Sequence, residues 1–344
     1  MSAGSPPGEL CLVTGASGFI GGALTRRLVG EGHRVRCLVR ETSNTAALRL
    51  LGVELVTGEL GSARSLAAAT DGVTQVIHCA ALVSDWATVA EIERVNVAGT
   101  RDLLEAAHAA ASVRRFIHFS TTDVYGHPAG RAIAESTRPG GFANWYAQTK
   151  LAAEEEVRRA GSGQGLETVI LRPATVYGPG SREVIGEIAR ALRAGHMLLI
   201  DRGRPIAGLA YVENVVDAAL LALTSPVAIG EAFNLTDGLA TTWRAFTDDL
   251  AAGLRCRPAR LSMPYPLAWV VGSGLEHGYR AERRASGLRT PPLLSRQAVG
   301  VLGRDQDFSN AKAHELLGWE PRVGYAEGLA ATLDWLHATL SSAP

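Results

Sequence analysis

The chain lacks the features that mark several classes of protein. Lys plus Arg and Asp plus Glu each total 34, so the formal net charge is zero, and no basic surface for a nucleic acid is indicated. No run reaches the roughly 18 apolar residues of a membrane span, and residues 264–275 come nearest. We therefore expect a small-molecule ligand, no nucleic-acid partner and no integral membrane segment.

Cysteine is also scarce, and its spacing matches none of the common metal motifs. The four residues are Cys11, Cys37, Cys79 and Cys256, with no CxxC or Cys/His ligand spacing. Three of them fall in apolar runs that are typical of buried strands. Residues 1–8 are small and uncharged, and the apolar run after them is too short for a signal peptide. We expect reduced cysteines, no metal site and a cytoplasmic location.

Hydrophobic periodicity is the feature that the chain does have. At 344 residues and 47% hydrophobic residues it can bury a large core, as one α/β unit or two joined lobes. Short apolar runs alternate with longer amphipathic stretches, as in buried parallel strands with crossover helices. The predicted strands cover residues 10–14, 35–39, 53–56, 75–79, 116–119 and 168–171. This pattern predicts the α/β class, with a Rossmann-type doubly wound parallel sheet.

The regular alternation ends after Pro173, where Pro and Gly become frequent. We predict a dinucleotide-binding domain over residues 9–175 and a smaller, mixed substrate-binding lobe over residues 176–344. Residues 205–235 are expected to return to the first domain. Residues 1–8 are expected to be a flexible N-terminus.

A glycine-rich loop follows the first predicted strand and opens a helix that runs to about Val29. Gly15, Gly18 and Gly21 permit a tight turn and let backbone N–H groups at a helix N-terminus approach a pyrophosphate. The alternative is a plain strand-to-helix turn. A strand before the loop, a helix after it and a second strand about twenty residues later favour nucleotide binding.

Tyr146 and Lys150 are four residues apart, which places them on the same face if both lie on one helix. A phenol has a reference pKa of about 10, and a neighbouring ammonium would ease its ionisation. The alternative is a packed aromatic beside a solvated lysine. The glycine loop makes the interpretation as a proton donor the better one.

Together these motifs give the chain a resemblance to the extended short-chain dehydrogenase/reductases of the NAD-dependent epimerase/dehydratase superfamily. The resemblance covers nearly the whole chain. It is carried by the glycine loop, Asn96 in the segment 95–100, Ser120-Thr121, Tyr146-xxx-Lys150, the Arg-Pro-containing segment 172–179, and the C-terminal segments 307–312 and 317–321. The chain looks most similar to the branch of 3β-hydroxysteroid dehydrogenases, dihydroflavonol reductases and bacterial ketone reductases.

The resemblance implies a role for each catalytic residue. Tyr146 is the acid/base, Lys150 holds the ribose hydroxyls of the cofactor, Thr121 supports the substrate oxygen, and Asn96 orders a water in a proton relay.

Two of these assignments have alternatives. Ser120 or Thr122 could supply the hydroxyl in place of Thr121, although the spacing back from Tyr125 favours Thr121. Asn96 could instead bond to the backbone.

The end of the second strand bears on the choice of cofactor. Val39 occupies the position where an acidic residue would bind the ribose of NAD, and Arg40 follows it, so NADP(H) is favoured. Glu41 leaves NAD(H) open, and Glu59 replaces the aspartate that the family usually has near the adenine. The positions expected to contact the cofactor are Gly15, Ser17, Gly18, Phe19, Ile20, Gly21, Arg40, Glu59, Leu60, Ala80, Ala81, Tyr146, Lys150, Pro173 and Val176.

Two absences bear on the substrate. Relatives that act on nucleotide-sugars have an arginine where this chain has Ala207, and the sugar dehydratases have an Asp-Glu pair where it has Asp123 alone. We therefore expect a small hydrophobic ketone or secondary alcohol, such as a steroid, a polyketide, a quinone-like compound or a β-keto acid. The positions expected to line its pocket are Asp123, Val83, Tyr177, Met197 and Trp145, and apolar stretches such as 197–200 and 263–271 could supply its walls.

Other interpretations remain at this point. The chain could be a nucleotide-sugar epimerase/dehydratase that holds NAD tightly, or a dinucleotide-sensing protein without catalysis. Residues 264–271 could rest on a membrane surface, although they lack the basic face of an interfacial helix. The resemblance also implies a homodimer through helices near residues 96–110 and 146–160.

Overall fold

A computed structural model describes residues 9–84, 86–128, 130–141, 144–163, 165–286 and 294–340. The predicted flexible N-terminus, residues 1–8, lies outside these described residues.

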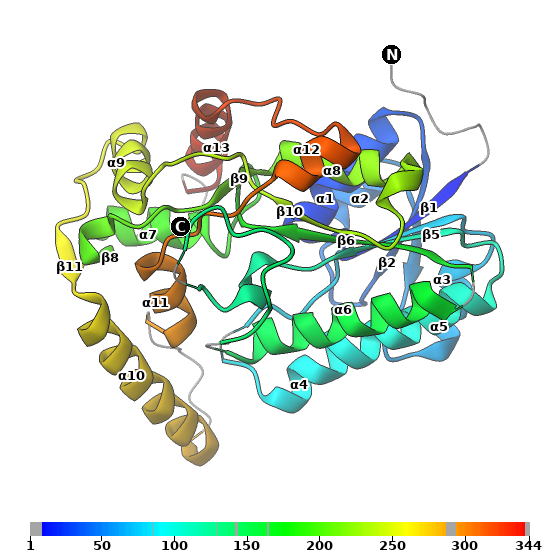
Figure 1. The fold of residues 1–344 in the computed structure, drawn as a ribbon, viewed down its shortest axis with the longest axis horizontal. Helices are drawn as coiled ribbons and strands as arrows, with labels where there is room; N and C mark the ends of the chain where they lie inside the picture. Colours follow the sequence, from blue (N-terminus) through cyan, green and yellow to red (C-terminus); the bar gives the residue numbers. More distant parts are fainter. Residues whose placement is uncertain are drawn as a thin grey trace.

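A seven-stranded parallel sheet, in the order β10-β6-β5-β4-β1-β2-β3, forms the centre of the molecule (Figure 1). The α/β fold class is therefore confirmed, and each of the six predicted strands is present. The strands are β1 (Leu10–Thr14), β2 (Arg34–Val39), β3 (Glu54–Thr57), β4 (Gln75–His78), β5 (Arg115–Phe119), β6 (Glu167–Pro173) and β10 (Ala232–Leu235). Every residue of β1, β4 and β5 is buried, because helices cover both faces.

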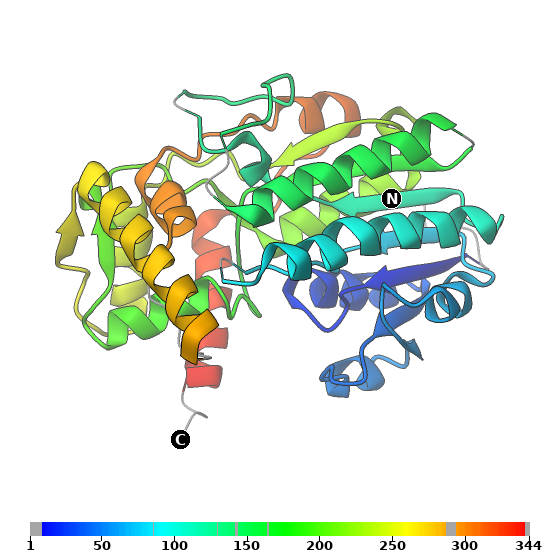
Figure 2. The same cartoon turned by 90° about the horizontal axis from the view of Figure 1, so that it is seen from below.

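The two faces of the sheet have separate cores. On one face α1 (Phe19–Gly30) packs against α8 (Val212–Thr224). On the other face lie α3 (Ala63–Thr70), α5 (Gly99–Ala109) and α6 (Trp145–Gly163). Figure 2 shows α5 and α6 lying side by side across this second face. The short elements of this half are α2 (Ala46–Leu50), α4 (Val89–Glu93), the π-helical turn η1 (Arg94–Ala98) and the 3-10 turn η2 (Thr122–Tyr125).

The second lobe is built mostly from residues after Pro173 and forms the left part of Figure 1, next to the start of α6. Two small parallel pairs join β7 (Thr175–Tyr177) to β9 (Leu209–Tyr211) and β8 (Leu198–Ile200) to β11 (Leu261–Met263). Its remaining elements are α7 (Ile185–Arg193), η3 (Asp201–Gly203), α9 (Trp243–Gly253), α10 (Tyr265–Ser286), α11 (Arg296–Gly303) and α13 (Tyr325–Leu340). The turn η4 (Pro226–Ala228) and helix α12 (Ala311–Leu317) lie instead beside the large sheet, where α12 packs against β10 (Figure 1).

The chain crosses between the two halves more than once. Strand β9 belongs to the second lobe, whereas α8 and β10, which follow it, complete the first half: β10 pairs with β6 at the edge of the large sheet. The sheet therefore takes strands from both sides of the boundary at residue 175.

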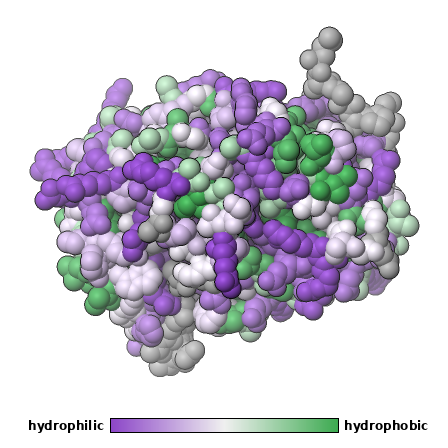
Figure 3. All heavy atoms as spheres, in the orientation of Figure 1, coloured by the Kyte–Doolittle hydropathy of each residue, from purple (hydrophilic) through white to green (hydrophobic). Residues whose placement is uncertain are grey.

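Helix α10 exposes apolar side chains near its start. Leu267 is 52% exposed and Val270 is 67% exposed, and Figure 3 shows hydrophobic residues in this region, at the lower left of the molecule. None of the helices in the described part combines the length and the apolarity that a membrane crossing needs.

Candidate active site

The glycine loop packs its own backbone too closely for side chains. Gly15 has φ of +73°, and a Cβ there would lie 2.7 Å from the backbone nitrogen of Ala80. A Cβ on Gly21 would lie 2.3 Å from the carbonyl oxygen of Gly15. No side chain caps the N-terminus of α1, which starts after Gly18. The glycines therefore let the loop pack closely against itself and against the segment after β4. The 12-residue helix behind the loop has no side-chain cap, and its free N-terminal N–H groups fit a cofactor pyrophosphate.

The other residues predicted to contact the cofactor follow the carboxyl ends of neighbouring strands. Arg40 comes directly after β2, is exposed, and exchanges hydrogen bonds with Ser43. Glu59 and Leu60 follow β3, and Ala80 and Ala81 follow β4. Because parallel strands end at one edge of a sheet, these side chains share that edge with the glycine loop.

Thr121 begins the short turn η2 just beyond β5. Its Oγ1 accepts a hydrogen bond from the backbone nitrogen of Asp123 at 3.2 Å, which leaves the hydroxyl hydrogen free to donate. Thr121 is 9% exposed, and the alternatives Ser120 and Thr122 are more deeply buried. This geometry is compatible with the predicted role of Thr121, which stays a prediction.

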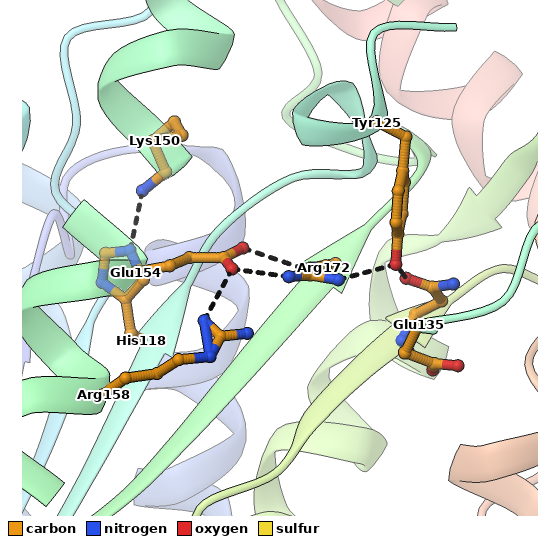
Figure 4. A network of polar contacts seen from close by, with 8 residues as sticks. His118, Tyr125, Glu135, Lys150, Glu154, Arg158 and Arg172 are labelled. Atoms are coloured by element: carbon orange, nitrogen blue, oxygen red, sulfur yellow. Dashed lines mark hydrogen bonds and ion pairs between the residues drawn. The ribbon is translucent and has the colours of Figure 1, made fainter. Parts of the chain in front are cut away.

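Tyr146 and Lys150 both lie on the first two turns of α6, as their spacing predicts. The Oδ1 of Asn144 accepts a hydrogen bond from the backbone nitrogen of Ala147 at 3.0 Å and so caps this end of the helix. Tyr146 is half-buried, and its phenol makes no hydrogen bond to the described residues. Lys150 is buried, and its Nζ contacts Nε2 of His118 at 3.3 Å (Figure 4). The same Nζ donates to the carbonyl oxygen of Phe119 at 2.6 Å. The lysine thus ties α6 to the end of β5.

The electrostatics of this pair differ from the expectation. Burial raises the pKa of Tyr146, and the carboxylates of Asp123 and Glu183 raise it further. Burial lowers the pKa of Lys150 to about 8, an effect that Glu154 and Cys79 partly offset. In the protein alone, desolvation therefore outweighs any help that the ammonium gives to ionisation of the phenol.

Asn96 lies in the π-helical turn η1, where it holds a loop. Its Oδ1 accepts from the backbone nitrogen of Leu82 at 2.7 Å, and its Nδ2 donates to the Leu82 carbonyl and to Oγ1 of Thr149, both at 3.2 Å. These contacts join the segment after β4 to α6. They match the backbone-bonding alternative, and the role of Asn96 in a proton relay stays a prediction.

The residues predicted to line the substrate pocket fall into two groups. Val83, Trp145 and Asp123 keep some exposure around the start of α6 and η2. Met197 and Tyr177, in contrast, are buried in the main hydrophobic core.

The prediction for Tyr177 is wrong, because its side chain is fully buried within the second lobe. Its ring packs against Tyr211, Phe246 and Tyr325, and a Cβ on Gly328 would lie 2.7 Å from its hydroxyl. Met197, although apolar as expected, is likewise a core residue.

Sequence reasoning missed a buried ionic network next to the site. Glu154, one turn after Lys150, forms a two-pronged ion pair with Arg172 of β6 at 2.8 and 2.6 Å. Arg172 donates to the hydroxyl of Tyr125 at 2.7 Å, and Tyr125 donates to Oδ1 of Asn234 at 2.8 Å (Figure 4). The network joins α6, β6, η2 and β10. A glutamate four residues after Lys150 on the same helix face was the available signal.

His118 was missed as well. It is a histidine in a strand whose neighbours are Phe116, Ile117 and Phe119, and all four side chains are buried. A polar ring in such a run was the signal that could have found it.

Two other kinds of candidate site, a cavity and a metal-binding cluster, give less support for a catalytic role. A cavity of about 880 Å³ between the segment around Arg131 and the second lobe is lined by four arginines, Arg131, Arg202, Arg204 and Arg304. Pro264, in the apolar stretch 263–271, also lines it, but none of the individually predicted site residues does. Within the described residues, no cluster of His, Cys, Asp or Glu could hold a metal ion, and all four cysteines are free.

The chain is similar to known proteins in both sequence and structure. Residues 11–236 match the NAD dependent epimerase/dehydratase family. A 4-hydroxy-2-methyl-3-oxo-4-farnesyl-3,4-dihydroquinoline-1-oxide ketoreductase from Stigmatella aurantiaca is 32% identical over 93% of this chain and 94% of its own. A 3 beta-hydroxysteroid dehydrogenase/Delta 5-->4-isomerase from Mycobacterium tuberculosis is 31% identical over 94% of this chain and 89% of its own. Among solved structures, MoeE5 in complex with UDP-glucose and NAD has a TM-score of 0.76 at 27% identity and covers 97% of this chain and 100% of its own.

Proposed function

Because the chain belongs to the NAD-dependent epimerase/dehydratase family, we propose that it is an NAD(P)-dependent oxidoreductase acting on a hydrophobic ketone or the matching secondary alcohol. One observation carries this proposal. The Lys150 amine bonds to Phe119 and so holds the start of α6, with Tyr146, against the end of β5, two residues before Thr121. The three side chains of the proposed reaction thus come from two elements that are tied together.

Tyr146 and Thr121 have separate roles in the proposed reaction. The cofactor, when bound, supplies the hydride to the carbonyl carbon in reduction and accepts it from the alcohol carbon in oxidation. Tyr146 gives its phenol proton to the substrate oxygen in reduction and takes a proton back in oxidation. The raised pKa of Tyr146 keeps the phenol protonated in the protein alone, which is the form that reduction needs. Thr121 donates a hydrogen bond to the oxygen as charge develops there.

Two features support NADP(H) over NAD(H). The last residue of β2 is Val39, a buried apolar residue. No carboxylate therefore stands at the position where the ribose of NAD would be bound. Arg40 is exposed directly after it, beside Ser43, where its guanidinium could pair with a 2′-phosphate.

A hydrophobic substrate is supported by what is missing from the second lobe. Ala207 is fully buried, and the following strand β9 is buried throughout, so this segment offers no cation to a diphosphate. The similar ketoreductase and the similar steroid dehydrogenase are named for ketone and steroid substrates, whereas MoeE5 was solved with UDP-glucose.

The deciding experiment measures oxidation of NADPH and NADH by the purified protein across steroids, quinones, flavonoid ketones and β-keto acids. We expect turnover of at least one hydrophobic ketone, with NADPH preferred, and a weaker NADPH affinity in Arg40→Ala. Arg49→Ala, which changes an exposed arginine on α2, is the matched control. Silence across the panel, together with NAD that copurifies, would instead support an epimerase; silence without any bound cofactor would support a sensor.

We also propose a homodimer through α5 and α6, which lie side by side on one face of the sheet. Light scattering after size-exclusion chromatography tests this, and a monomeric mass at micromolar concentration would contradict it.

A further inference from the structure

We propose that His118 is a positioning residue for Lys150: its Nε2 accepts a hydrogen bond from the Lys150 amine and holds that amine in place and in its charged form. The inference deepens the proposed function and rests on it, since Lys150 acts there by binding the ribose hydroxyls of the cofactor.

The hydrogen bond has only one chemically reasonable direction. The amine nitrogen lies 3.3 Å from Nε2 of His118 (Figure 4) and 2.6 Å from the carbonyl oxygen of Phe119. An ammonium has three donors and no acceptor, so Nε2 must accept and the hydrogen of the neutral ring sits on Nδ1. Two acceptors on β5 therefore direct two of the three N–H groups of Lys150, and the third is left for a ligand.

This contact costs free energy, because it leaves the other nitrogen of the ring as an unpaired buried donor. Nδ1 of His118 is buried and has no hydrogen-bond partner in the described part of the chain. An apolar residue would fit the strand without that penalty, as Phe116 and Ile117 do. Among the described residues, the contact with Lys150 is the one hydrogen bond of the ring, and it accounts for a polar side chain at this position.

His78 provides an internal comparison. It lies on β4 directly opposite His118 in the sheet register and is equally buried. Its Nδ1 lies 2.7 Å from Oγ1 of Thr14 and its Nε2 lies 2.9 Å from Oγ1 of Thr100. Both ring nitrogens of His78 are therefore used within the fold, whereas the His118 ring, which also packs against the His78 ring with centroids 5.3 Å apart, has one hydrogen-bond partner among the described residues, and that partner is Lys150.

The electrostatic surroundings of His118 and Lys150 agree with a hydrogen bond that Lys150 donates and His118 accepts. Burial lowers the pKa of His118 well below its usual value, and the positive charge of Lys150 lowers it further, so the ring stays neutral and accepts. Burial also lowers the pKa of Lys150 to about 8, so the ammonium depends on its acceptors. The titratable groups that face the pair are Glu154 and Arg158 on α6, Cys79 after β4 and His78 on β4.

Loss of the His118 acceptor should change the pKa of Lys150 in one direction. A hydrogen bond accepted from the ammonium favours the charged form, so removing the acceptor lowers the pKa of Lys150 further. At a pH near 8, more of the protein would then carry a neutral amine and bind the cofactor ribose less tightly.

The experiment is a fluorescence titration of NADPH from neutral to alkaline pH in the wild type, His118→Phe and His118→Gln. We expect wild-type affinity to fall as the pH rises through about 8. In His118→Phe the midpoint should move to lower pH by about one unit, with roughly fivefold weaker binding near pH 8. His118→Gln, whose amide oxygen can replace Nε2 as an acceptor, should restore most of the wild-type profile. The control His196→Phe, at an exposed position after α7 and outside the proposed dimer helices, should leave the profile unchanged.

Two outcomes would overturn the inference: a profile of His118→Phe that superimposes on that of the wild type, or a shift that His118→Gln shares in full, which indicates a packing role. If the wild type binds neither NADPH nor NADH, the proposed function fails instead. NMR titration of the Lys150 amine in the protein alone then still decides, because the inference requires a lower amine pKa in His118→Phe and an unchanged one refutes it.

Discussion

Two polar regions lie one turn apart on α6 and differ in how completely their groups are paired. Around Glu154, the carboxylate binds Arg172 and Arg158, and Arg172 continues to Tyr125. Around Lys150, the Tyr146 phenol makes no hydrogen bond to the described residues, and Oγ of Ser120 and Nδ1 of His118 are buried without a partner there. Unpaired buried groups are costly. We infer that the first region maintains the architecture and that the second is kept for a ligand.

The largest expected effect tests the second region. Tyr146→Phe removes one hydroxyl that bonds to nothing described, so stability should hardly change, whereas turnover should fall by roughly 10²–10⁴-fold through loss of the proton donor. Steady-state kinetics and urea unfolding on the same preparation check both parts. Tyr325→Phe, on α13, removes a phenol hydroxyl that bonds to Asp249 rather than to any predicted site residue; it is the matched control and should keep its turnover. Turnover of Tyr146→Phe near the wild-type rate would remove the mechanism.

The next effect tests the first region. Arg172→Met leaves the Glu154 carboxylate buried beside a single, partly exposed arginine, so the free energy of unfolding should fall by about 3–5 kcal/mol. The double variant Arg172→Met/Glu154→Leu should recover much of that loss, because no unpaired charge remains. Chemical denaturation of both variants measures this, and a single variant as stable as the wild type would contradict an architectural role.

Lys150→Met should raise the free energy of unfolding, whereas Arg172→Met lowers it, and this difference distinguishes the region around Lys150 from the region around Glu154. The folded pKa of Lys150 lies below its unfolded value, about 8 against 10.5, so folding favours the neutral amine and the charged form costs stability below pH 8. Methionine removes that cost but leaves its acceptors without a donor, and we expect a net gain of about 1 kcal/mol at pH 7. The slope of wild-type stability, rising between about pH 8 and 10.5, should vanish in the variant. Cofactor binding should weaken. A loss of stability at pH 7 would show that Lys150 is primarily structural.

An effect of similar size is expected at the end of the ionic network. Tyr125→Phe removes the hydroxyl that links Arg172 to Asn234, so the free energy of unfolding should fall by about 1–2 kcal/mol. Cofactor affinity should be unchanged, since Tyr125 touches neither the glycine loop nor Lys150. A tenfold change in that affinity would mean that the two regions are coupled.

Much of the first half could be predicted from sequence, because its signals are local. The strand periods, the glycine spacing and the four-residue step from Tyr146 to Lys150 each depend on a few neighbouring residues. The second lobe offered no such pattern. Tyr177 was expected to line the substrate pocket, yet three aromatic rings from distant parts of the chain pack around it.

The sequence by itself determined the fold class, the place of the dinucleotide loop and the helix that carries Tyr146 and Lys150, since hydrophobic period and glycine spacing act over short stretches of chain. Only the tertiary structure decided what surrounds those two side chains. It buries the phenol so that its pKa rises rather than falls, turns the lysine toward His118 and Phe119, and closes the Glu154–Arg172 pair across 18 residues. Desolvation and charge pairing depend on neighbours that come from separate elements, and the linear order of residues does not state which elements will meet.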